Sequence, residues 1–315
     1  MAAADLIVAQ FGFNPMTDPR WLGFPTDVTD YLATVHPDRV ASLETPGRGV
    51  KSFIVPNYNA VCGIREVQGA DSLHTRRYHR WIERIVRASD TAQSIAFPDP
   101  NTIHLHSVAH PALDALDVRY VTTEPSVVLP ADRFDRVLDA ELTVWRNRRA
   151  TGLAWIADGA SSVRGLDDAF DAMSAPGFDP RRWAVIEGSL DGIPRRRAGD
   201  SERATDRVAV ADFRPERLTL TVHTGAPGLL VVSEIAMPGW RATVNGAPTR
   251  IRVADGVLRA VPAPAGDSQV EFRYEPTSYR LGLYLTVWSV GLIAGLWAGT
   301  RAVRGMSREP APFRL

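Results

Sequence analysis

The sequence predicts an α+β chain: a mixed α/β domain, then an antiparallel β-sandwich, then one C-terminal transmembrane helix. Three observations lead to this prediction. Helical and strand patterns alternate irregularly over residues 15–200, and short alternating strands separated by Gly and Pro turns follow over residues 205–276. Residues 281–300 are then free of charge. A chain of 315 residues is long enough for two soluble domains besides this helix.

The composition excludes several classes of function. With 36 basic and 36 acidic residues the chain is formally neutral, so no nucleic-acid partner is predicted, because such a partner requires a basic face. The single cysteine, Cys62, rules out an intramolecular disulfide. The sequence has no P-loop, GxSxG, HExxH or dinucleotide fingerprint. No cofactor is therefore predicted.

Residues 1–14 form the first predicted segment. Their apolar run is too short to span a bilayer, is interrupted by Asp5, and lacks the basic start of a signal peptide. It fits either the end of a preceding membrane segment or an N-terminal strand or short helix. The first reading would make the chain the C-terminal part of a longer polytopic protein, or a truncated gene product.

The mixed domain is predicted over residues 15–200. Trp81, Ile82, Ile85 and Val86 have the spacing of one helix face, which predicts a helix over 78–89. Shorter patterns predict further helices over 111–116 and 165–173, and strands over 118–123, 141–147, 152–158 and 182–188. The charged segment 193–206 is predicted to be a linker or exposed loop.

The block between residues 57 and 78 contains the candidate substrate-binding residues Asn57, Asp71, Arg77 and Tyr78, with Asn59 among them. Amide and carboxylate groups hydrogen-bond the vicinal hydroxyls of sugars, and an aromatic ring covers a sugar's apolar face. The competing interpretation is that these groups only fix loops to the domain.

His104, His106 and His110 are the nearest approach to a metal site. In a strand, His104 and His106 would share one face, but no carboxylate or cysteine at ligand spacing completes the set. We therefore predict hydrogen-bonding histidines at a strand-to-helix turn, and no metal site.

The β-sandwich is predicted over residues 205–276. Its clearest signal is Asn245-Gly246 between two alternating runs, since a type I′ hairpin turn requires positive φ at both residues. Residues 228–235 are continuously apolar up to Ser233 and predict a buried strand. Trp240 begins a strand and is interpreted as a core or interface residue in preference to a sugar platform.

Residues 281–300 are predicted to cross the membrane, because twenty uncharged residues in a helix reach about 30 Å. A buried hairpin helix is the alternative. The tail 301–315 carries an excess of arginine over acid, which places it in the cytoplasm and the large domain outside the cell membrane. The arginines of the tail are Arg301, Arg304, Arg308 and Arg314.

Gly291, Gly295 and Gly299 form a ridge of small residues on one face of this helix. Such a ridge allows another helix to approach closely, although glycine also occurs in membrane helices without a packing role. The predicted partner is another membrane helix of the same or an adjacent polypeptide, or a second copy of the chain.

Several short motifs resemble the C-terminal region of YfhO-type bacterial membrane proteins. The strongest lie over 228–285, and weaker ones precede them in the same order as in that family. They comprise Pro238-Gly239-Trp240-Arg241-Ala242, Val244-Asn245-Gly246, Val261 to Gly266 and Val270 to Tyr274, with Gly69 to Leu73 and Val118 to Val121 upstream. The chain departs from the pattern in lacking a Pro-Arg pair after residues 141–147 and the family's long multi-helix membrane portion.

The resemblance implies a GT-C-like glycosyltransferase that uses lipid-linked sugar donors and acts on envelope glycans or lipids. Such enzymes keep their catalytic acid in an early extracytoplasmic loop, so the catalytic portion would be missing from this chain and the chain alone would be inactive. The implied partners are membrane lipid, a lipid-linked sugar or envelope glycan, and the remaining membrane helices. The alternative is a non-enzymatic, membrane-anchored module that binds glycans or serves as a scaffold.

Overall fold

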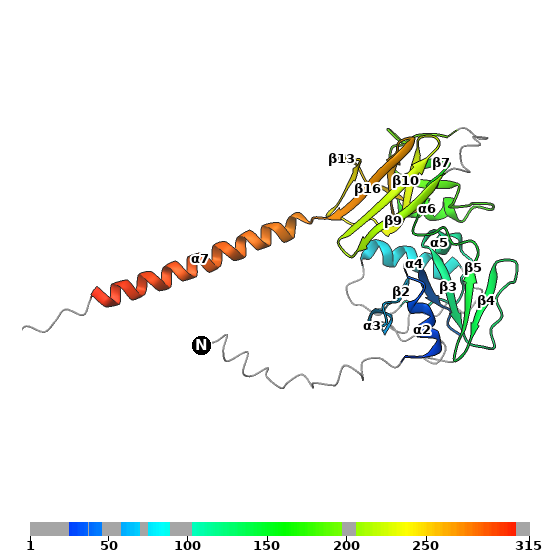
Figure 1. Cartoon of the computed structure of the whole chain (residues 1–315), viewed down its shortest axis with the longest axis horizontal. Helices are drawn as coiled ribbons and strands as arrows, with labels where there is room; N and C mark the ends of the chain where they lie inside the picture. Colours follow the sequence, from blue (N-terminus) through cyan, green and yellow to red (C-terminus); the bar gives the residue numbers. More distant parts are fainter. Residues whose placement is uncertain are drawn as a thin grey trace, which may run out of the picture.

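A computed structural model describes residues 25–36, 38–45, 58–69, 75–88, 103–196 and 206–306. It confirms the α+β fold class. Figure 1 shows three parts: a β-rich upper lobe, a lower lobe that contains a third sheet and several helices, and a long helix that projects from the upper lobe. The predicted segment 1–14, and residues 307–315 of the tail, lie outside the described residues.

A six-stranded sheet forms the central layer of the molecule. Its strand order is β6-β11-β15-β14-β8-β7, and all neighbours are antiparallel except β7 and β8. The strands are β6 (Ala154–Ala157), β11 (Gly228–Ile235), β15 (Leu258–Ala263), β14 (Arg252–Ala254), β8 (Trp183–Glu187) and β7 (Gly159–Val163). The six residues from Gly228 to Ser233 of β11 are buried, as expected for a strand covered on both faces.

A five-stranded antiparallel sheet packs on one face of the central sheet and completes the sandwich. Its order is β13-β12-β16-β10-β9, and the strands are β13 (Ala247–Thr249), β12 (Trp240–Val244), β16 (Gly266–Tyr274), β10 (Arg217–Thr224) and β9 (Arg207–Arg214). Leu220, Val270 and Phe272 of this sheet contact a common core with Leu230 and Val261 of the central sheet. Alternate residues of each strand thus face inward.

The sandwich recruits strands from before residue 200. β6, β7 and β8 come from residues 154–187, and β6 pairs directly with β11. The sandwich core likewise includes Leu153 and Ile156. The sheet therefore crosses the boundary predicted near residues 200–205, because the apolar face of β11 is completed by a strand that lies far away in sequence.

The third sheet has the order β2-β1-β3-β5-β4. Its strands are β2 (Arg65–Glu66), β1 (Arg39–Ser42), β3 (Val118–Thr123), β5 (Thr143–Asn147) and β4 (Phe134–Asp139). β1 runs parallel to β2 and β3, whereas β5 is antiparallel to β3 and β4. This sheet is therefore mixed, with β2, β1 and β3 as its parallel part.

Helices fill the space between the third sheet and the central sheet. α4 (Arg76–Ala88) buries Trp81, Ile82 and Ile85 in a core that also takes residues from both sheets. α5 (Pro111–Ala115) and α6 (Leu166–Met173) join the same core, and α2 (Asp27–Ala33) packs on the opposite face of the third sheet. α3 (Tyr58–Val61) is a single turn beside β2.

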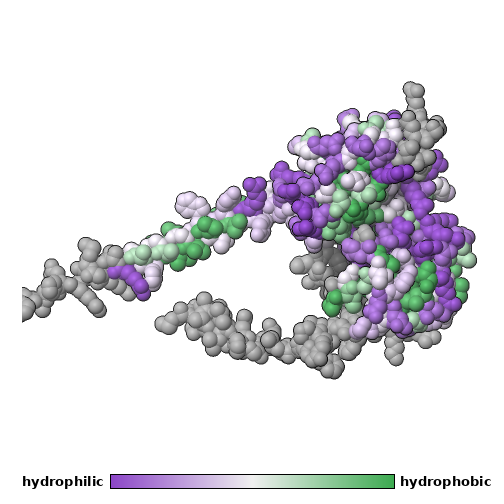
Figure 2. All heavy atoms as spheres, viewed as in Figure 1, coloured by the Kyte–Doolittle hydropathy of each residue, from purple (hydrophilic) through white to green (hydrophobic). Residues whose placement is uncertain are grey.

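The final helix, α7 (Thr277–Met306), contains the predicted membrane span. Among the described residues it is the one helix long and apolar enough to cross a bilayer, and none of its apolar stretch is buried against the protein. Figure 2 shows this apolar helix projecting from a largely hydrophilic domain surface. The described residues therefore do not support the buried-hairpin alternative, because none of them covers the apolar stretch of the helix. A continuous exposed apolar surface of this size is expected to be covered by lipid or by other membrane helices.

Two residues, Glu275 and Pro276, connect β16 to α7. The Glu275 amide donates to the Gly239 carbonyl at 2.7 Å, and Gly239 has φ of +98°. A Cβ atom there would lie 2.9 Å from the Tyr274 ring, so glycine is required at this close approach. The predicted Asn245-Gly246 turn is also confirmed, with φ of 51° and 78°.

Asp255 occupies the turn between β14 and β15 and is fully buried. Its Oδ1 accepts a hydrogen bond from the Val185 amide at 2.8 Å, but its Oδ2 is buried and has no partner within the described part of the chain. Burial raises the pKa of Asp255 to about 7. In the unfolded chain the same group ionises near its ordinary pKa of 3.8, so between these values the folded state holds one more proton than the unfolded state.

We therefore predict that the free energy of unfolding falls as pH rises from about 4 to 7, by roughly 1.4 kcal/mol for each pH unit in this range. Asp255→Asn should remove this slope and should be more stable than the parent at pH 8. The amide keeps an acceptor for Val185 and tolerates the positive φ of 48° found here. Thermal unfolding of the detergent-solubilised chain at several pH values measures the effect, with the exposed Asp132→Asn as control. An unchanged slope in Asp255→Asn would contradict the assignment.

Candidate functional site

Three arginines converge on Glu234 where the third sheet meets the sandwich. Arg39 begins β1 and Arg65 begins β2, and the two are register partners in the parallel pair. Arg39 Nη2 donates to Glu234 Oε1 at 2.7 Å, and Arg65 donates to the same oxygen. Arg259 of β15 approaches Glu234 Oε2 at 3.6 Å. One carboxylate of β11 thus receives guanidinium groups from three strands in two sheets.

This arginine cluster is largely removed from solvent, with side-chain exposure of 10% for Arg39 and 3% for Arg259. Burial lowers the pKa of Arg259 to about 10. Burial also acts to raise the pKa of Glu234, but the charges of Arg39, Arg65 and Arg259 outweigh this effect and hold that pKa below its ordinary value. Glu234 therefore remains ionised, and its charge is what keeps three arginines together.

Arg39 and Arg259 make further contacts besides those with Glu234. Arg39 Nη1 donates to the Leu116 carbonyl at 2.9 Å and to Ser233 Oγ at 2.7 Å. The Arg259 guanidinium lies 3.7 Å from the Trp240 ring centroid, a cation–π distance. Trp240 is half-buried against the sandwich core, which agrees with its interpretation as a core or interface residue.

A pocket of about 390 Å³ lies next to the arginine cluster at the edge strand β2. Arg39 and Arg65 form part of its wall. The rest is lined by the polar residues Asn59, Glu66, Gln68 and Tyr78 and by the apolar residues Ile64, Val67, Ile103, Leu116 and Ile235, with Gly69. Its size falls in the range of small-molecule sites. We call it the β2 pocket.

The β2 pocket extends along the whole of the two-residue strand β2. Arg39 and Arg65 are the first residues of β1 and β2, and Leu116 lies just before β3. Gln68 and Ile103 line the pocket beyond the other end of β2. β2 is an edge strand, and no other described strand pairs with its outer side.

Most polar groups in the β2 pocket have protein partners. Gln68 accepts from the Ser42 amide at 2.6 Å and donates to the Ile103 carbonyl at 3.3 Å, and the Tyr78 hydroxyl donates to the Val67 carbonyl at 2.7 Å. Two acceptors differ: Asn59 Oδ1 and Glu66 Oε2 are buried from solvent, and neither has a hydrogen-bond partner among the residues that the structure describes. Buried acceptors in this state are uncommon in folded proteins.

Glu66 is also electrostatically unusual. Its other oxygen, Oε1, lies 3.1 Å from Ser42 Oγ. Burial raises the pKa of Glu66 to about 7; the Ser42 hydrogen bond opposes this rise and the nearby Glu44 adds to it. Glu66 thus changes charge near neutral pH, which is a property of binding and catalytic groups as well as of buried structural ones.

The structure brings two of the predicted substrate-binding residues, Asn59 and Tyr78, into the lining of the β2 pocket. Asn57 and Asp71 lie outside the described residues. Arg77 lies elsewhere: its Nε donates to the Gly256 carbonyl at 2.6 Å, and its guanidinium pairs with Glu187, which fixes α4 to the central sheet. Arg39, Arg65, Glu66 and Gln68 do not stand out in the sequence; the available signal was the group of polar residues in and just after the two-residue strand β2.

The three histidines are not gathered into one site. His104 Nδ1 lies 2.7 Å from Glu44 Oε2, and His106 Nδ1 lies 3.4 Å from the Glu44 carbonyl. His110 caps α5 by accepting from the Ala112 amide at 3.1 Å, and burial lowers its pKa to about 4. Within the described ranges no group of three His, Cys, Asp or Glu residues is placed to hold a metal.

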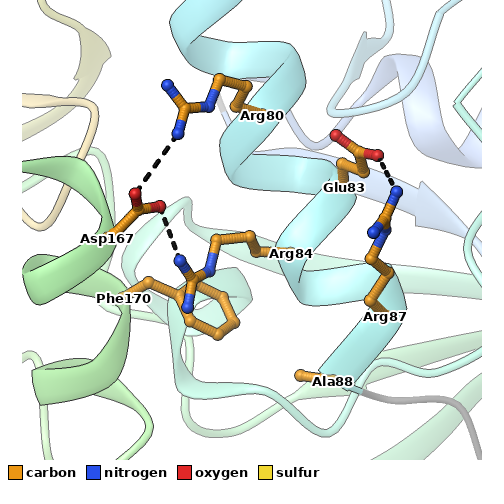
Figure 3. A pocket seen from close by; sticks show the side chains of 7 residues that line it. All are labelled: Arg80, Glu83, Arg84, Arg87, Ala88, Asp167 and Phe170. Carbon is orange, nitrogen blue, oxygen red and sulfur yellow. Dashed lines mark hydrogen bonds and ion pairs between the residues drawn. The ribbon is translucent and has the colours of Figure 1, made fainter.

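A second pocket, of about 550 Å³, lies between α4 and α6 and is rich in arginine. Figure 3 shows Arg80 and Arg84 of α4 both directed at Asp167 of α6, with the Arg84 guanidinium over the Phe170 ring. The shortest of these contacts joins Arg84 Nη1 to Asp167 Oδ1 at 2.6 Å. Asp167 and Asp171 pair with α4 while their side chains stay largely exposed, so this pocket is a helix–helix contact in which each arginine already has an acidic partner.

Gly291, Gly295 and Gly299 lie in α7. A Cβ atom added at any of them would meet nothing within 4 Å, so the face they form is open. The helix-packing role stays a prediction.

Residues 201–286 match the family model described as bacterial membrane protein YfhO. The match covers β9 to β16 and the first ten residues of α7. It confirms the resemblance over this part of the chain, and together with α7 it supports association with a membrane. No curated protein and no solved structure gives a significant match.

Because all three arginines of the cluster approach the Glu234 carboxylate, Glu234→Ala should destabilise the chain by about 3–5 kcal/mol, as expected when one partner of a buried ion pair is removed. Denaturant unfolding of the solubilised chain measures this loss. Asp171→Ala removes an exposed partner of Arg84 and should change stability little. Equal effects of the two substitutions would show that the cluster does not hold the lobes together.

Proposed function

We propose that this chain is the extracytoplasmic and terminal membrane part of a YfhO-like membrane glycosyltransferase that modifies cell-envelope glycans or lipids. The observation that carries the proposal is the family match over residues 201–286, which runs without a break from the sandwich into the membrane helix. The β2 pocket, with its polar lining and size, supports a role in binding.

The proposal assigns the transfer chemistry to a membrane portion outside these 315 residues. In this proposal α7 packs against other membrane helices through the face formed by Gly291, Gly295 and Gly299. The large domain binds a lipid-linked sugar or an envelope glycan. The partners are thus membrane lipid, those helices and a sugar ligand. The acids of α6 are unsuited to general acid–base work, since Asp167 and Asp171 are paired with Arg84 and Asp168 with Arg164.

Membranes of the bacterium that encodes the chain test this function. Deleting the chain should abolish transfer of a sugar from a polyprenyl-phosphate donor to an envelope acceptor, and restoring it should recover the activity. The purified chain alone should give no turnover. Full transfer in the deletion strain would contradict the proposal, and so would turnover by the purified chain that one carboxylate substitution abolishes.

A non-enzymatic, membrane-anchored glycan-binding or scaffolding module is the second candidate. The observation that favours it is the β2 pocket itself, whose described lining includes polar and aromatic side chains but a single carboxylate, that of Glu66. In this case deletion should leave glycosyl transfer unchanged and should reduce retention of an envelope glycan at the membrane.

Orientation is part of the proposal. The arginines at 301, 304, 308 and 314 favour a cytoplasmic tail, which places the large domain outside the cell membrane. We predict that alkaline phosphatase fused after residue 315 is inactive in whole cells, whereas a reporter that is active only in the cytoplasm works at the same position. When the same two reporters are inserted after Gly246, in an exposed turn of the large domain, the phosphatase should be active and the cytoplasmic reporter inactive. An active phosphatase fused after residue 315 would contradict the proposed topology.

A further inference from the structure

A row of arginines crosses the outer sheet of the sandwich, the sheet with the order β13-β12-β16-β10-β9. Arg241 of β12 is the register partner of Arg273 of β16. Arg273 also pairs with Arg217 of β10, and Arg217 pairs with Arg214 of β9. Arg250, the residue after β13, continues the row in the register of β13 with β12. We call these five residues the arginine row.

The arginine row lies on the face of the sheet that points away from the sandwich core. Register partners point to the same side of a sheet, and successive residues of a strand point to opposite sides. Ala242 and Phe272, next to the row, are buried in the core, so the arginines point outward. Their side chains are open to solvent, with exposure of 34% for Arg217 and 65% for Arg241, and Arg250 is exposed as well.

The acids beside the arginine row do not balance its charge. Carboxylates pair with four of its arginines at distances between 2.7 and 3.6 Å, and they belong to Asp212, Glu271 and Glu275. A fourth acid, Glu216, acts on Arg217 electrostatically. With Arg280 of α7, six arginines exceed these four acids by two charges. Like charges on directly opposite residues destabilise a sheet, so an anionic surface over the row would offset a cost of the fold.

The arginine row lies at the end of the outer sheet from which α7 leaves. Three residues separate Arg273 from the first residue of α7. At 3.3 Å per extended and 1.5 Å per helical residue, Arg273 lies at most about 20 Å from Leu281, where the uncharged stretch begins. A headgroup layer of about 6 Å, a Debye length of about 8 Å and the length of an arginine side chain together cover this distance. Figure 2 shows hydrophilic side chains gathered on the domain where α7 begins.

Aromatic side chains lie between the arginine row and the uncharged stretch of α7. Trp240 and Tyr274 are register partners one residue closer to the end of the sheet, and their ring centroids are 5.4 Å apart. Tyr274 is 39% exposed, and Tyr279 in the first turn of α7 is 69% exposed. Tyrosine and tryptophan are enriched at the boundary between membrane and water. This level of the molecule therefore has the side chains expected at a bilayer surface.

We propose that the arginine row binds the anionic headgroups of phospholipids in the leaflet that faces the large domain. Guanidinium groups donate to phosphate oxygens, often through two parallel hydrogen bonds. An arginine close to an anionic bilayer strengthens binding about fivefold. The inference rests on α7 spanning a membrane. It holds for either orientation of the chain, and it does not depend on glycosyl transfer.

Lipid binding to the full chain in a non-ionic detergent tests the arginine row. Native mass spectrometry compares the dissociation constants of phosphatidylglycerol, which is anionic, and phosphatidylcholine, which is zwitterionic. We expect phosphatidylglycerol to bind at least about fivefold more tightly. Raising ammonium acetate from about 50 mM to about 500 mM should reduce this preference, because salt screens exposed charges. The pair Arg241→Gln with Arg273→Gln should remove most of it.

Control variants separate the arginine row from other charges and from folding. Arg207→Gln changes an exposed arginine at the other end of β9 and should leave the preference unchanged. Arg241→Lys with Arg273→Lys keeps the charge and should retain the preference. The Gln pair should unfold at the same temperature as the parent in phosphatidylcholine nanodiscs, since both side chains are at least half exposed. If that midpoint falls, Arg214→Gln with Arg250→Gln, at the two ends of the row, provides the same test.

Three outcomes would overturn the inference. Equal affinities for the two lipids would show that the charge is not used, and so would a preference that persists in both Gln pairs. A preference lost in Arg280→Gln and kept in both Gln pairs would assign the lipid to the start of α7 alone. Displacement of phosphatidylglycerol by an equal concentration of glucose 1-phosphate would make the arginine row a site for a sugar phosphate and exclude bilayer lipid as its ligand.

Discussion

The charge of Glu234 is the constraint on which the arrangement of the two lobes depends. β11 is buried on both faces within the central sheet, and its penultimate residue holds Arg39 and Arg65 from the third sheet and Arg259 from β15. The attraction is strong because little water reaches the cluster. Arg39 and Arg65 also form part of the wall of the β2 pocket, so the ion cluster between the lobes helps to shape the candidate site.

The central sheet connects the lower lobe, through the outer sheet of the sandwich, to the membrane helix α7. Its one face packs on the sheet that contains β16, and β16 leads through two residues into α7. The bond from Glu275 to Gly239 and the close contact of Gly239 with Tyr274 fix the start of the helix against the sandwich. The domain that precedes α7 is therefore joined to this helix by a connection of two residues, one of which is hydrogen-bonded to the sandwich.

Asp255 shows how packing creates a buried ionisable group. It lies in a turn where Gly256 approaches the Trp81 ring so closely that a Cβ at Gly256 would lie 2.5 Å from Trp81 Nε1. Because α4 packs onto the central sheet at this point, the Asp255 carboxyl is removed from water, and burial raises its pKa to about 7. Asn59 Oδ1 and Glu66 Oε2 are as withdrawn from solvent as Asp255 Oδ2, and none of these three oxygens has a hydrogen-bond partner among the described residues.

The sequence by itself determined the local elements. The apolar stretch at 281–300, the Asn245-Gly246 turn, the buried strand at 228–235 and the helices at 78–89 and 165–173 each follow from a pattern within a few turns of chain. Only the tertiary structure decided which of these elements pair and which side chains meet in one pocket. β6 joins β11 across some seventy residues, and the β2 pocket gathers Arg39, Glu66 and Tyr78 from three separate elements. Such pairings depend on which apolar faces and charges complement each other in space, and local periodicity carries no record of that choice.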